Sequence, residues 1–338
     1  DYVNSLNPKR ANIATNLANL PRTMMASLDL SAPLNQGFGM ASRKEFYKNL
    51  GSMLKAFSSE GRFRDIQAEI LTRPSYKAAR KAGLRITDLG EKLENREEVF
   101  MSNLVDKIPG VAGSQRAYTG FLNKLRMDVY DDLVRKAGIA GEDVGAGSKV
   151  LEDIANIVNN FTGGAKVGKL EQGSPALNAL LFSPRKIKST LEILNPVNYV
   201  SPSISPTARK AAIRNLLGST LIATTVIKLS RMLGGEESEV DPRSADFGKV
   251  KIGDTRVDVS GGNASYLTLI SRLWTGETKS TTSGAITPLG TGFGQTSRLG
   301  LVGQFGRNKL SPLASLVADI FQGENAIGEK KTPTQSVI

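Results

Sequence analysis

The chain has 338 residues, 44 Lys and Arg against 32 Asp and Glu, a net charge of +12, and neither histidine nor cysteine. Without these two residue types it cannot itself provide a Ser-His-Asp triad, a cysteine nucleophile, a Cys/His zinc site, an iron–sulfur cluster or a histidine-ligated haem. Only 6% of the residues are aromatic and 34 are glycine, which favours thin helical layers over one thick core. Because the first residue is Asp1, we expect a processed product or a piece of a longer protein.

The basic excess predicts attraction to a polyanion, either DNA or an anionic membrane surface. Between Arg43 and Arg85 there are eleven basic and four acidic residues. A solvated helix face explains this as well as phosphate binding does. No zinc finger, basic zipper or aromatic-rich RNA-binding pattern is present in the sequence, so DNA contacts would be to phosphates without base preference. Our candidates for these contacts are Lys77, Arg80, Lys81, Arg185, Lys186 and Lys188.

Apolar residues at helical spacing predict that most of the first 200 residues are helical. The first two apolar stripes run from Phe46 to Phe57 and from Phe63 to Ile70, before Pro74 breaks the pattern, and a third helix ends at Gly83. The longest stripe contains Tyr118, Phe121, Leu122, Leu125, Val129 and Leu133, and Gly138 is expected to end it. Another helix is predicted from Lys149 to Phe161.

A helix is also predicted to start at Ser183-Pro184-Arg185, with Ser183 as the cap and Pro184 in the first turn. Arg185 would then belong to a helix-starting turn, and the alternative is that it binds phosphate or a partner's carboxylate. The three prolines between Pro196 and Pro206 mark the best boundary. We therefore expect one helical domain over residues 1–200 and a second over 201–338, which contains a hydrophobic helix, a hairpin and C-terminal helices.

The hydrophobic helix is expected from Thr207 to Leu233, and its middle, residues 215–227, contains no charge. Thirteen helical residues span roughly 20 Å, which is less than the ~30 Å hydrocarbon core of a bilayer. Three interpretations stay open: a buried core helix, a membrane-interface segment with basic ends, and a contact between helices of an oligomer. Either of the last two would use Leu216, Leu217, Leu221, Ile222, Val226 and Ile227.

One β-hairpin is predicted at residues 249–259, where polar and apolar residues alternate around Gly253-Asp254. Pairing around this turn places Val250 opposite Val257 and Lys249 opposite Asp258, with one apolar face that something must cover. Helices at Tyr266–Trp274 and Leu313–Phe321 follow, separated by a span rich in glycine, threonine and serine. The predicted fold class is therefore mainly α, an elongated or layered multi-helix architecture with one small hairpin.

Several patterns look chemical but lack the context that chemistry needs. Gly290, Gly292 and Gly294 are not placed between a strand and a helix, so we expect a loop rather than a dinucleotide site. Asp131 and Asp132 are adjacent on a helix and cannot face each other. Asp241 and Asp246 flank Arg243, which favours an arginine-anchored turn over a cation site. We therefore predict no catalytic residue, no cofactor and no metal, and a protein that is not an enzyme.

Six short motifs, in the same order, resemble the large polyvalent proteins of tailed bacteriophages. The motifs are Leu28-Asp29-Leu30-Ser31-Ala32-Pro33, Phe121-Leu122-Asn123-Lys124-Leu125-Arg126, Leu181-Phe182-Ser183-Pro184-Arg185, Val240-Asp241-Pro242-Arg243-Ser244, Asp246-Phe247-Gly248-Lys249 and Gly306-Arg307-Asn308-Lys309-Leu310-Ser311-Pro312. The resemblance extends from about Leu20 to Thr332. One departure stands out: Gly164-Ala165 follows Asn160-Phe161-Thr162-Gly163, where an arginine-containing turn is expected.

This resemblance implies a non-enzymatic internal virion or ejection protein, packaged in the capsid and delivered with the genome into the host envelope or cytoplasm. The partners it implies are further copies of the chain, the portal or other virion proteins, double-stranded DNA bound without sequence preference, and the host membrane after ejection. The alternatives are a membrane-active conduit component, a minor capsid or portal-associated protein that stays in the particle, and an enzyme whose active module lies outside this chain.

Overall fold

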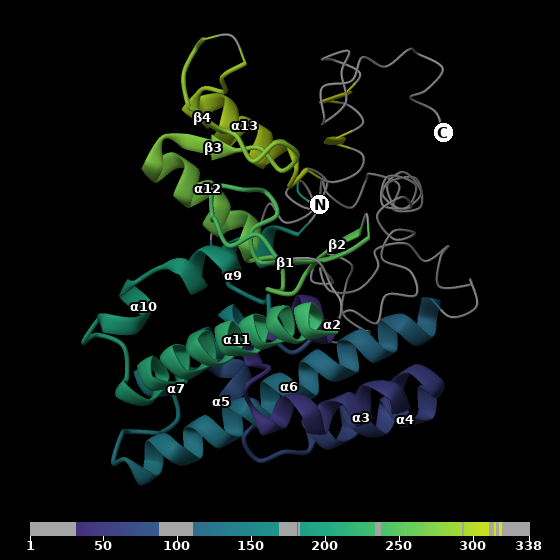
Figure 1. The fold of residues 1–338 in the computed structure, drawn as a ribbon. Helices are drawn as coiled ribbons and strands as arrows, with labels where there is room; N and C mark the ends of the chain where they lie inside the picture. The colour runs from purple at the N-terminus through teal and green to yellow at the C-terminus, as the bar shows by residue number, and fades with distance from the viewer. Residues whose placement is uncertain are drawn as a thin grey trace, which may run out of the picture.

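The computed structural model describes residues 32–87, 111–168, 181, 183–233, 238–253, 255–292, 294–310, 314–315 and 318–319. Within these ranges the protein is mainly helical and carries two small antiparallel two-stranded sheets, which confirms the predicted fold class. A layered helical bundle is followed by a smaller lobe that contains both sheets (Figure 1). The motif residues 28–31 and most of the helix expected at Leu313–Phe321 lie outside the described residues.

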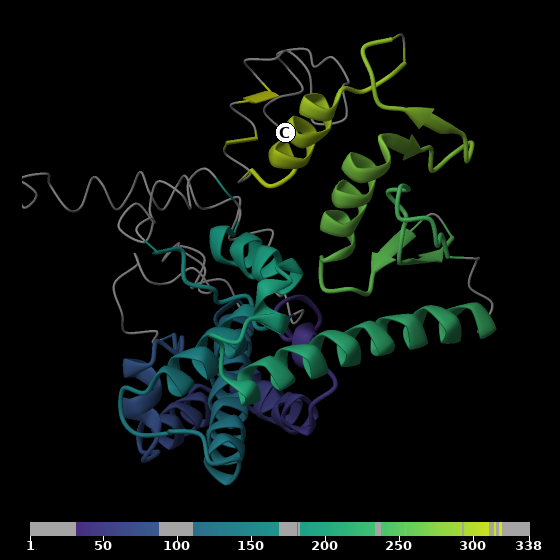
Figure 2. The same cartoon turned by 90° about the vertical axis from the view of Figure 1, so that its left-hand side faces the viewer.

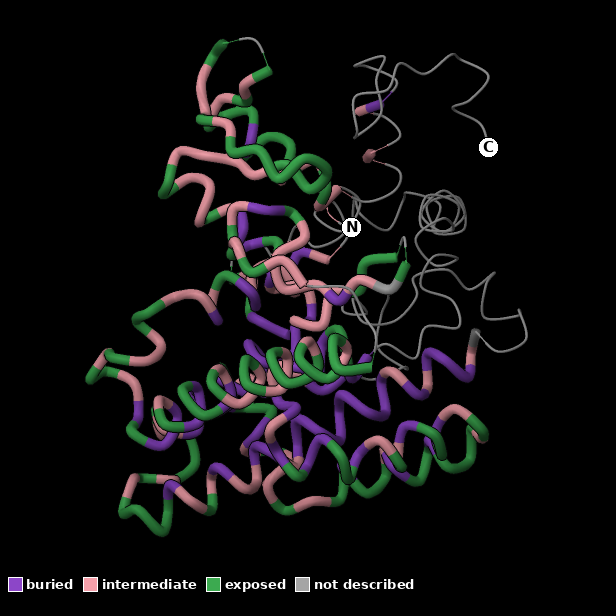
Figure 3. Tube along the Cα trace, in the orientation of Figure 1, coloured by how far each residue is buried: buried purple, intermediate pink, exposed green. Residues whose placement is uncertain are grey.

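The bundle is built around α6 (Val111–Ile139), which is buried along most of its length (Figure 3). The stripe predicted for this helix is confirmed, because Phe121, Leu122, Leu125 and Val129 are all fully buried. Against α6 pack α3 (Lys44–Ser58), α4 (Glu60–Leu71), α5 (Tyr76–Lys81) and α7 (Lys149–Asn160). The short elements α2 (Ala32–Asn35) and η1 (Phe38–Met40) precede them.

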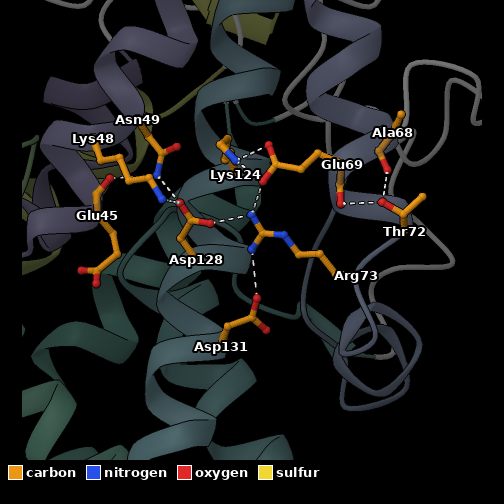
Figure 4. Close-up of polar contacts among 10 residues, drawn as sticks. All are labelled: Glu45, Lys48, Asn49, Ala68, Glu69, Thr72, Arg73, Lys124, Asp128 and Asp131. Atoms are coloured by element: carbon orange, nitrogen blue, oxygen red, sulfur yellow. Dashed lines mark hydrogen bonds and ion pairs between the residues drawn. The ribbon is translucent and has the colours of Figure 1, made fainter.

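An ionic cluster joins the end of α4 to α6 (Figure 4). The guanidinium of Arg73 donates to Asp128 at 2.6 Å, to Asp131 at 2.9 Å and to Glu69 at 2.8 Å. Lys124 donates to Glu69 as well, at 2.5 Å. Burial alone would lower the pKa of Arg73, but its hydrogen bonds to Asp128 and Glu69 outweigh burial and raise it. The cluster is therefore a structural clamp between two helices.

Asp132, the neighbour of Asp131, has different partners, as its position on the helix predicts. It accepts hydrogen bonds from Arg135 and Lys136 and lies 3.8 Å from the buried guanidinium of Arg43. Arg43 in turn donates to Asn215 at 2.7 Å. These contacts connect the residue that precedes α3 with α6 and α11, and Asp131 and Asp132 do not form a paired-carboxylate site.

After α7 come α9 (Pro184–Leu194), α10 (Val197–Val200) and the long helix α11 (Pro206–Met232). The predicted start of α9 is confirmed, with Pro184 in its first turn, although the Ser183 side chain makes no capping bond. The first half of α11 packs on the bundle through Ala208, Ala211 and Ala212, and its second half extends beyond the bundle (Figure 2). The domain boundary at residues 200–201 stays a prediction, but α11 shares the core of the helices before it.

In the C-terminal lobe, β1 (Lys249–Ile252) and β2 (Thr255–Asp258) form the predicted hairpin in the predicted register. Val250 pairs with Val257 and Lys249 with Asp258, and Gly253 has a positive φ of 56°, as a tight hairpin turn requires. The apolar face is covered only in part, because Val250 is buried whereas Val257 is 43% exposed. Local sequence therefore determines the pairing but not the packing.

The lobe continues with α12 (Ala264–Thr275), β3 (Glu277–Lys279), β4 (Ile286–Pro288) and α13 (Arg298–Arg307). The pairing of β3 with β4 is a second hairpin that the sequence did not predict, because its strands are only three residues long and lie in a span rich in glycine, threonine and serine. The predicted arginine-anchored turn is confirmed: Arg243 donates to both carboxylate oxygens of Asp241 and also to Glu277. Asp246 pairs with Arg256 instead, so the two aspartates do not form a cation site.

Candidate phosphate-contact site

The three basic candidates on α5 lie together on an exposed face. Lys77, Arg80 and Lys81 occupy positions i, i+3 and i+4, and all three are exposed, while Ala79 between them is buried against the bundle. Arg80 is further positioned by a 2.8 Å hydrogen bond from its Nη1 to the carbonyl oxygen of Ile86. The α5 face is therefore a compact cationic surface held by an apolar anchor.

The three basic candidates on α9 separate from one another. Arg185 is only 4% exposed and lies toward α5. Lys186 instead donates to the carbonyl oxygen of Asn35 at 2.8 Å, and burial lowers its pKa to about 8. Lys188 forms an ion pair with Glu192 one turn later. Of these three, the structure places only Arg185 beside the α5 candidates.

Arg80 and Arg185 line the same pocket, which has a volume of about 320 Å³. Two further cations line it, Arg85 after α5 and Lys166 after α7. We call it the α5–α9 pocket. Its described lining residues include no carboxylate and no aromatic side chain; the others are Gly83, Leu84, Ile86, Thr87, Asn159 and Gly164. Four positive side chains from three separate segments thus meet at one cavity.

Asn159, near the end of α7, holds the segment after α5 in place. Its side-chain amide donates to the carbonyl oxygen of Gly83 at 2.8 Å, and its Oδ1 accepts from the backbone N–H of Arg85 at 2.9 Å. Gly83 has a φ of +87°, a conformation that favours glycine. A Cβ at Gly83 would also lie 2.3 Å from the Lys166 Nζ. The glycine therefore lets the Lys166 side chain lie directly over the backbone.

A second glycine admits a buried arginine behind the pocket. A Cβ at Gly164 would lie 2.8 Å from Nη2 of Arg126 and 3.0 Å from Cδ of Arg85. Arg126 comes from α6, is fully buried, and donates to the hydroxyl and the carbonyl oxygen of Thr162 at 2.8 and 2.7 Å. Where the resemblance leads us to expect an arginine in the turn, this chain has a glycine with the Arg126 guanidinium packed against it.

Arg85 and Lys166 were not among the sequence candidates. Arg85 ends the basic segment that begins at Arg43, so the sequence shows its charge but not that it lines the α5–α9 pocket. Lys166 lies in a glycine-rich segment between two predicted helices, and nothing in its spacing relates it to the basic residues of the other segments. Only the packing of α7 and α9 beside α5 brings these positions together.

The uncharged middle of α11 has two unlike sides. Leu216 and Ile222 are half-buried and pack on the bundle core, whereas Leu217 and Leu221 are 64% and 67% exposed. Val226 is 40% exposed, and Ile227 is half-buried. The interpretation of α11 as a fully buried core helix is therefore wrong: the helix extends past the bundle, and nothing in the described part of the chain covers its outer side.

The exposed row on the outer side of α11 is formed by Ile213, Leu217 and Leu221, at intervals of one helical turn. Ile213 was not among the sequence candidates. Exposed Lys210 and Lys228 lie beyond the two ends of this row, and α11 contains no acidic residue. The outer side is thus apolar in its middle and basic at its ends. No helix among the described residues meets the length and apolarity needed to cross a bilayer.

A scan against protein-family models found no match, and searches of curated proteins and of solved structures found none either. Within the described ranges, no group of acidic side chains is arranged to hold a metal ion.

Proposed function

We propose that this chain is a non-enzymatic internal virion protein of a tailed phage that binds the packaged genome through its phosphates and enters the host with it. The virion assignment is supported by the six ordered motifs, which resemble phage polyvalent proteins. The DNA-binding part is carried by one observation: cations from α5, from the segments after α5 and α7, and from α9 converge on one surface. Copies of the chain and the portal are its proposed protein partners.

The chemistry of this surface favours phosphate contact over base recognition. Lysine and arginine side chains bind phosphate oxygens by charge-assisted hydrogen bonds, and these contacts carry no sequence information. α5 has only six residues, about 9 Å of helix, which suits contact along a phosphate backbone better than insertion into a groove. Binding that ignores sequence is what a protein packaged with a whole genome requires.

Salt dependence tests the DNA proposal. Each phosphate contact contributes about −0.9 to the slope of log affinity against log salt for duplex DNA. We expect the double variant Lys77→Glu/Lys81→Glu to reduce this slope by about 2. The matched control is Lys44→Glu/Lys55→Glu, which replaces two exposed lysines on α3 and alters the net charge by the same amount. Equal slopes for the two double variants, or no duplex binding by the native chain at low salt, would contradict the proposal.

A second candidate function is a membrane-associated stage after ejection, and the outer side of α11 favours it. Exposed leucines between basic ends are typical of helices that lie in the headgroup region of an anionic bilayer. Another alternative, a minor capsid or portal-associated protein that stays in the particle, is separated from an ejected protein by sedimenting virions before and after DNA release. An ejected protein leaves the particle fraction with the DNA, and a retained one does not.

A further inference from the structure

We infer that the α5–α9 pocket, which borders the exposed α5 face and shares Arg80 with it, is a binding site for a single phosphate group. The inference deepens the proposed function, because it names the chemical group that part of the same surface recognises. It does not depend on DNA being the source of that group. A phosphate can reach the pocket as part of the DNA backbone or as a free inorganic ion.

The first argument is the match between the lining and the ligand. Arg80, Arg85 and Arg185 bring guanidinium groups, whose planar arrangement of donors fits phosphate oxygens, and Lys166 adds an ammonium. Arg185 is 96% buried in the first turn of α9, where the helix N-terminus adds partial positive charge. Such a set of donors fits an anion with several oxygens better than a neutral ligand.

The second argument is that the chain makes room for these cations. Gly83 and Gly164 stand where any Cβ would come within 3 Å of a basic side chain. At Gly83 that side chain is Lys166, and at Gly164 it is Arg126, which supports the pocket from behind. At both positions the absence of a side chain leaves room for a basic group to lie directly against the backbone.

The third argument concerns size and specificity. A volume of about 320 Å³ is at the lower end of the roughly 300–1,000 Å³ found for ligand pockets. The described lining offers no aromatic ring on which a base could stack. The pocket therefore has room for a phosphate with little attached to it, or for one phosphate of a longer backbone, and its described lining gives no stacking platform for a base.

Lys166 is the position at which to test the site. It is exposed, and it makes no hydrogen bond or ion pair with any described residue, so we expect its substitution to leave the fold intact. Calorimetric titration of the full chain with inorganic phosphate and with pyrophosphate, at low ionic strength, measures binding. We expect Lys166→Glu to weaken both by about tenfold or more, since it reverses one of four converging charges. Lys166→Arg should retain binding, and Lys44→Glu is the charge-matched control.

A duplex arm of the same experiment identifies the source of the phosphate. If Lys166→Glu weakens both phosphate and duplex binding, the pocket holds a backbone phosphate; if it weakens only phosphate binding, the pocket holds the free ion. Both results support the site. If the native chain binds phosphate but no duplex, the DNA proposal fails and the site stands. The site is refuted if the native chain binds neither phosphate nor pyrophosphate. It is also refuted if Lys166→Glu and Lys44→Glu have the same affinity for these ions while both variants unfold at the same temperature as the native chain.

Discussion

Replacing Arg73 with alanine should destabilise the bundle far more than the same change at Arg64. Both arginines form ion pairs with a glutamate four residues earlier, Arg64 with Glu60 at 2.5 Å and Arg73 with Glu69 at 2.8 Å. The two pairs are alike in sequence spacing, although Arg64 lies within α4 and Arg73 follows its end. They differ in what surrounds them, which makes Arg64→Ala a matched control for Arg73→Ala.

The expected magnitude follows from burial and from the additional partners. Arg73 is 16% exposed and also binds Asp128, which is 9% exposed. Removing one partner of a buried pair costs about 3–5 kcal/mol. Asp128 keeps a 3.0 Å hydrogen bond from Asn49, so we expect a loss near the lower end, about 3 kcal/mol. Arg64 is 75% exposed, and exposed pairs contribute about 0–1 kcal/mol.

Urea unfolding followed by circular dichroism measures both losses, and a thermal scan gives a second estimate. For a domain of about 150–250 residues, 1 kcal/mol shifts Tm by about 2–4 °C, so Arg73→Ala should lower Tm by roughly 6–12 °C. The shift for Arg64→Ala should be less than about 4 °C. Equal shifts for the two variants would refute the view that the Arg73 cluster clamps α4 to α6.

The difference in stability between the native chain and Arg73→Ala should also depend on pH. Hydrogen bonds from Lys124 and Arg73 hold the pKa of Glu69 below its ordinary value of 4.5. A carboxylate whose pKa is lower in the folded state stabilises the protein at pH values above its unfolded pKa, and this contribution is lost as pH falls through the folded pKa. The native chain should therefore lose stability below about pH 4.5, and the gap between it and Arg73→Ala should narrow there. A gap that stays constant down to pH 2 would contradict this.

Two predictions concern α11. Ile222→Lys should lower the free energy of unfolding by about 1–2 kcal/mol, because Ile222 packs on the core. The adjacent Leu221 is exposed and should tolerate lysine, and urea unfolding of both variants tests this. If the outer side of α11 binds anionic bilayers, Leu217→Ser/Leu221→Ser should reduce flotation with vesicles that contain phosphatidylserine, while Leu54→Ser, which is 59% exposed on α3, should not. Flotation that is equal in all three proteins would remove the membrane stage.

Several features that depend on a few consecutive residues were predicted correctly. The fold class follows from apolar spacing, which is visible wherever a helix buries one side. The start of α9 follows from Pro184, whose fixed φ suits a first helical turn. The register of β1 and β2 follows from a two-residue turn, because such a turn leaves one way to align its flanking residues. The β3–β4 hairpin was not predicted, because its short strands show neither an apolar pattern nor a two-residue turn between them.

Features that depend on residues far apart in the chain were decided by the tertiary structure. Helical spacing shows that Leu217 and Leu221 share a side of α11, but not that the bundle ends before it can cover them. The sequence likewise reveals the charges of Arg80 and Arg185, but their meeting at a pocket with Lys166 requires α5, α7 and α9 to pack together. Local backbone preferences act over a few residues, whereas burial and charge proximity depend on which distant surfaces come into contact.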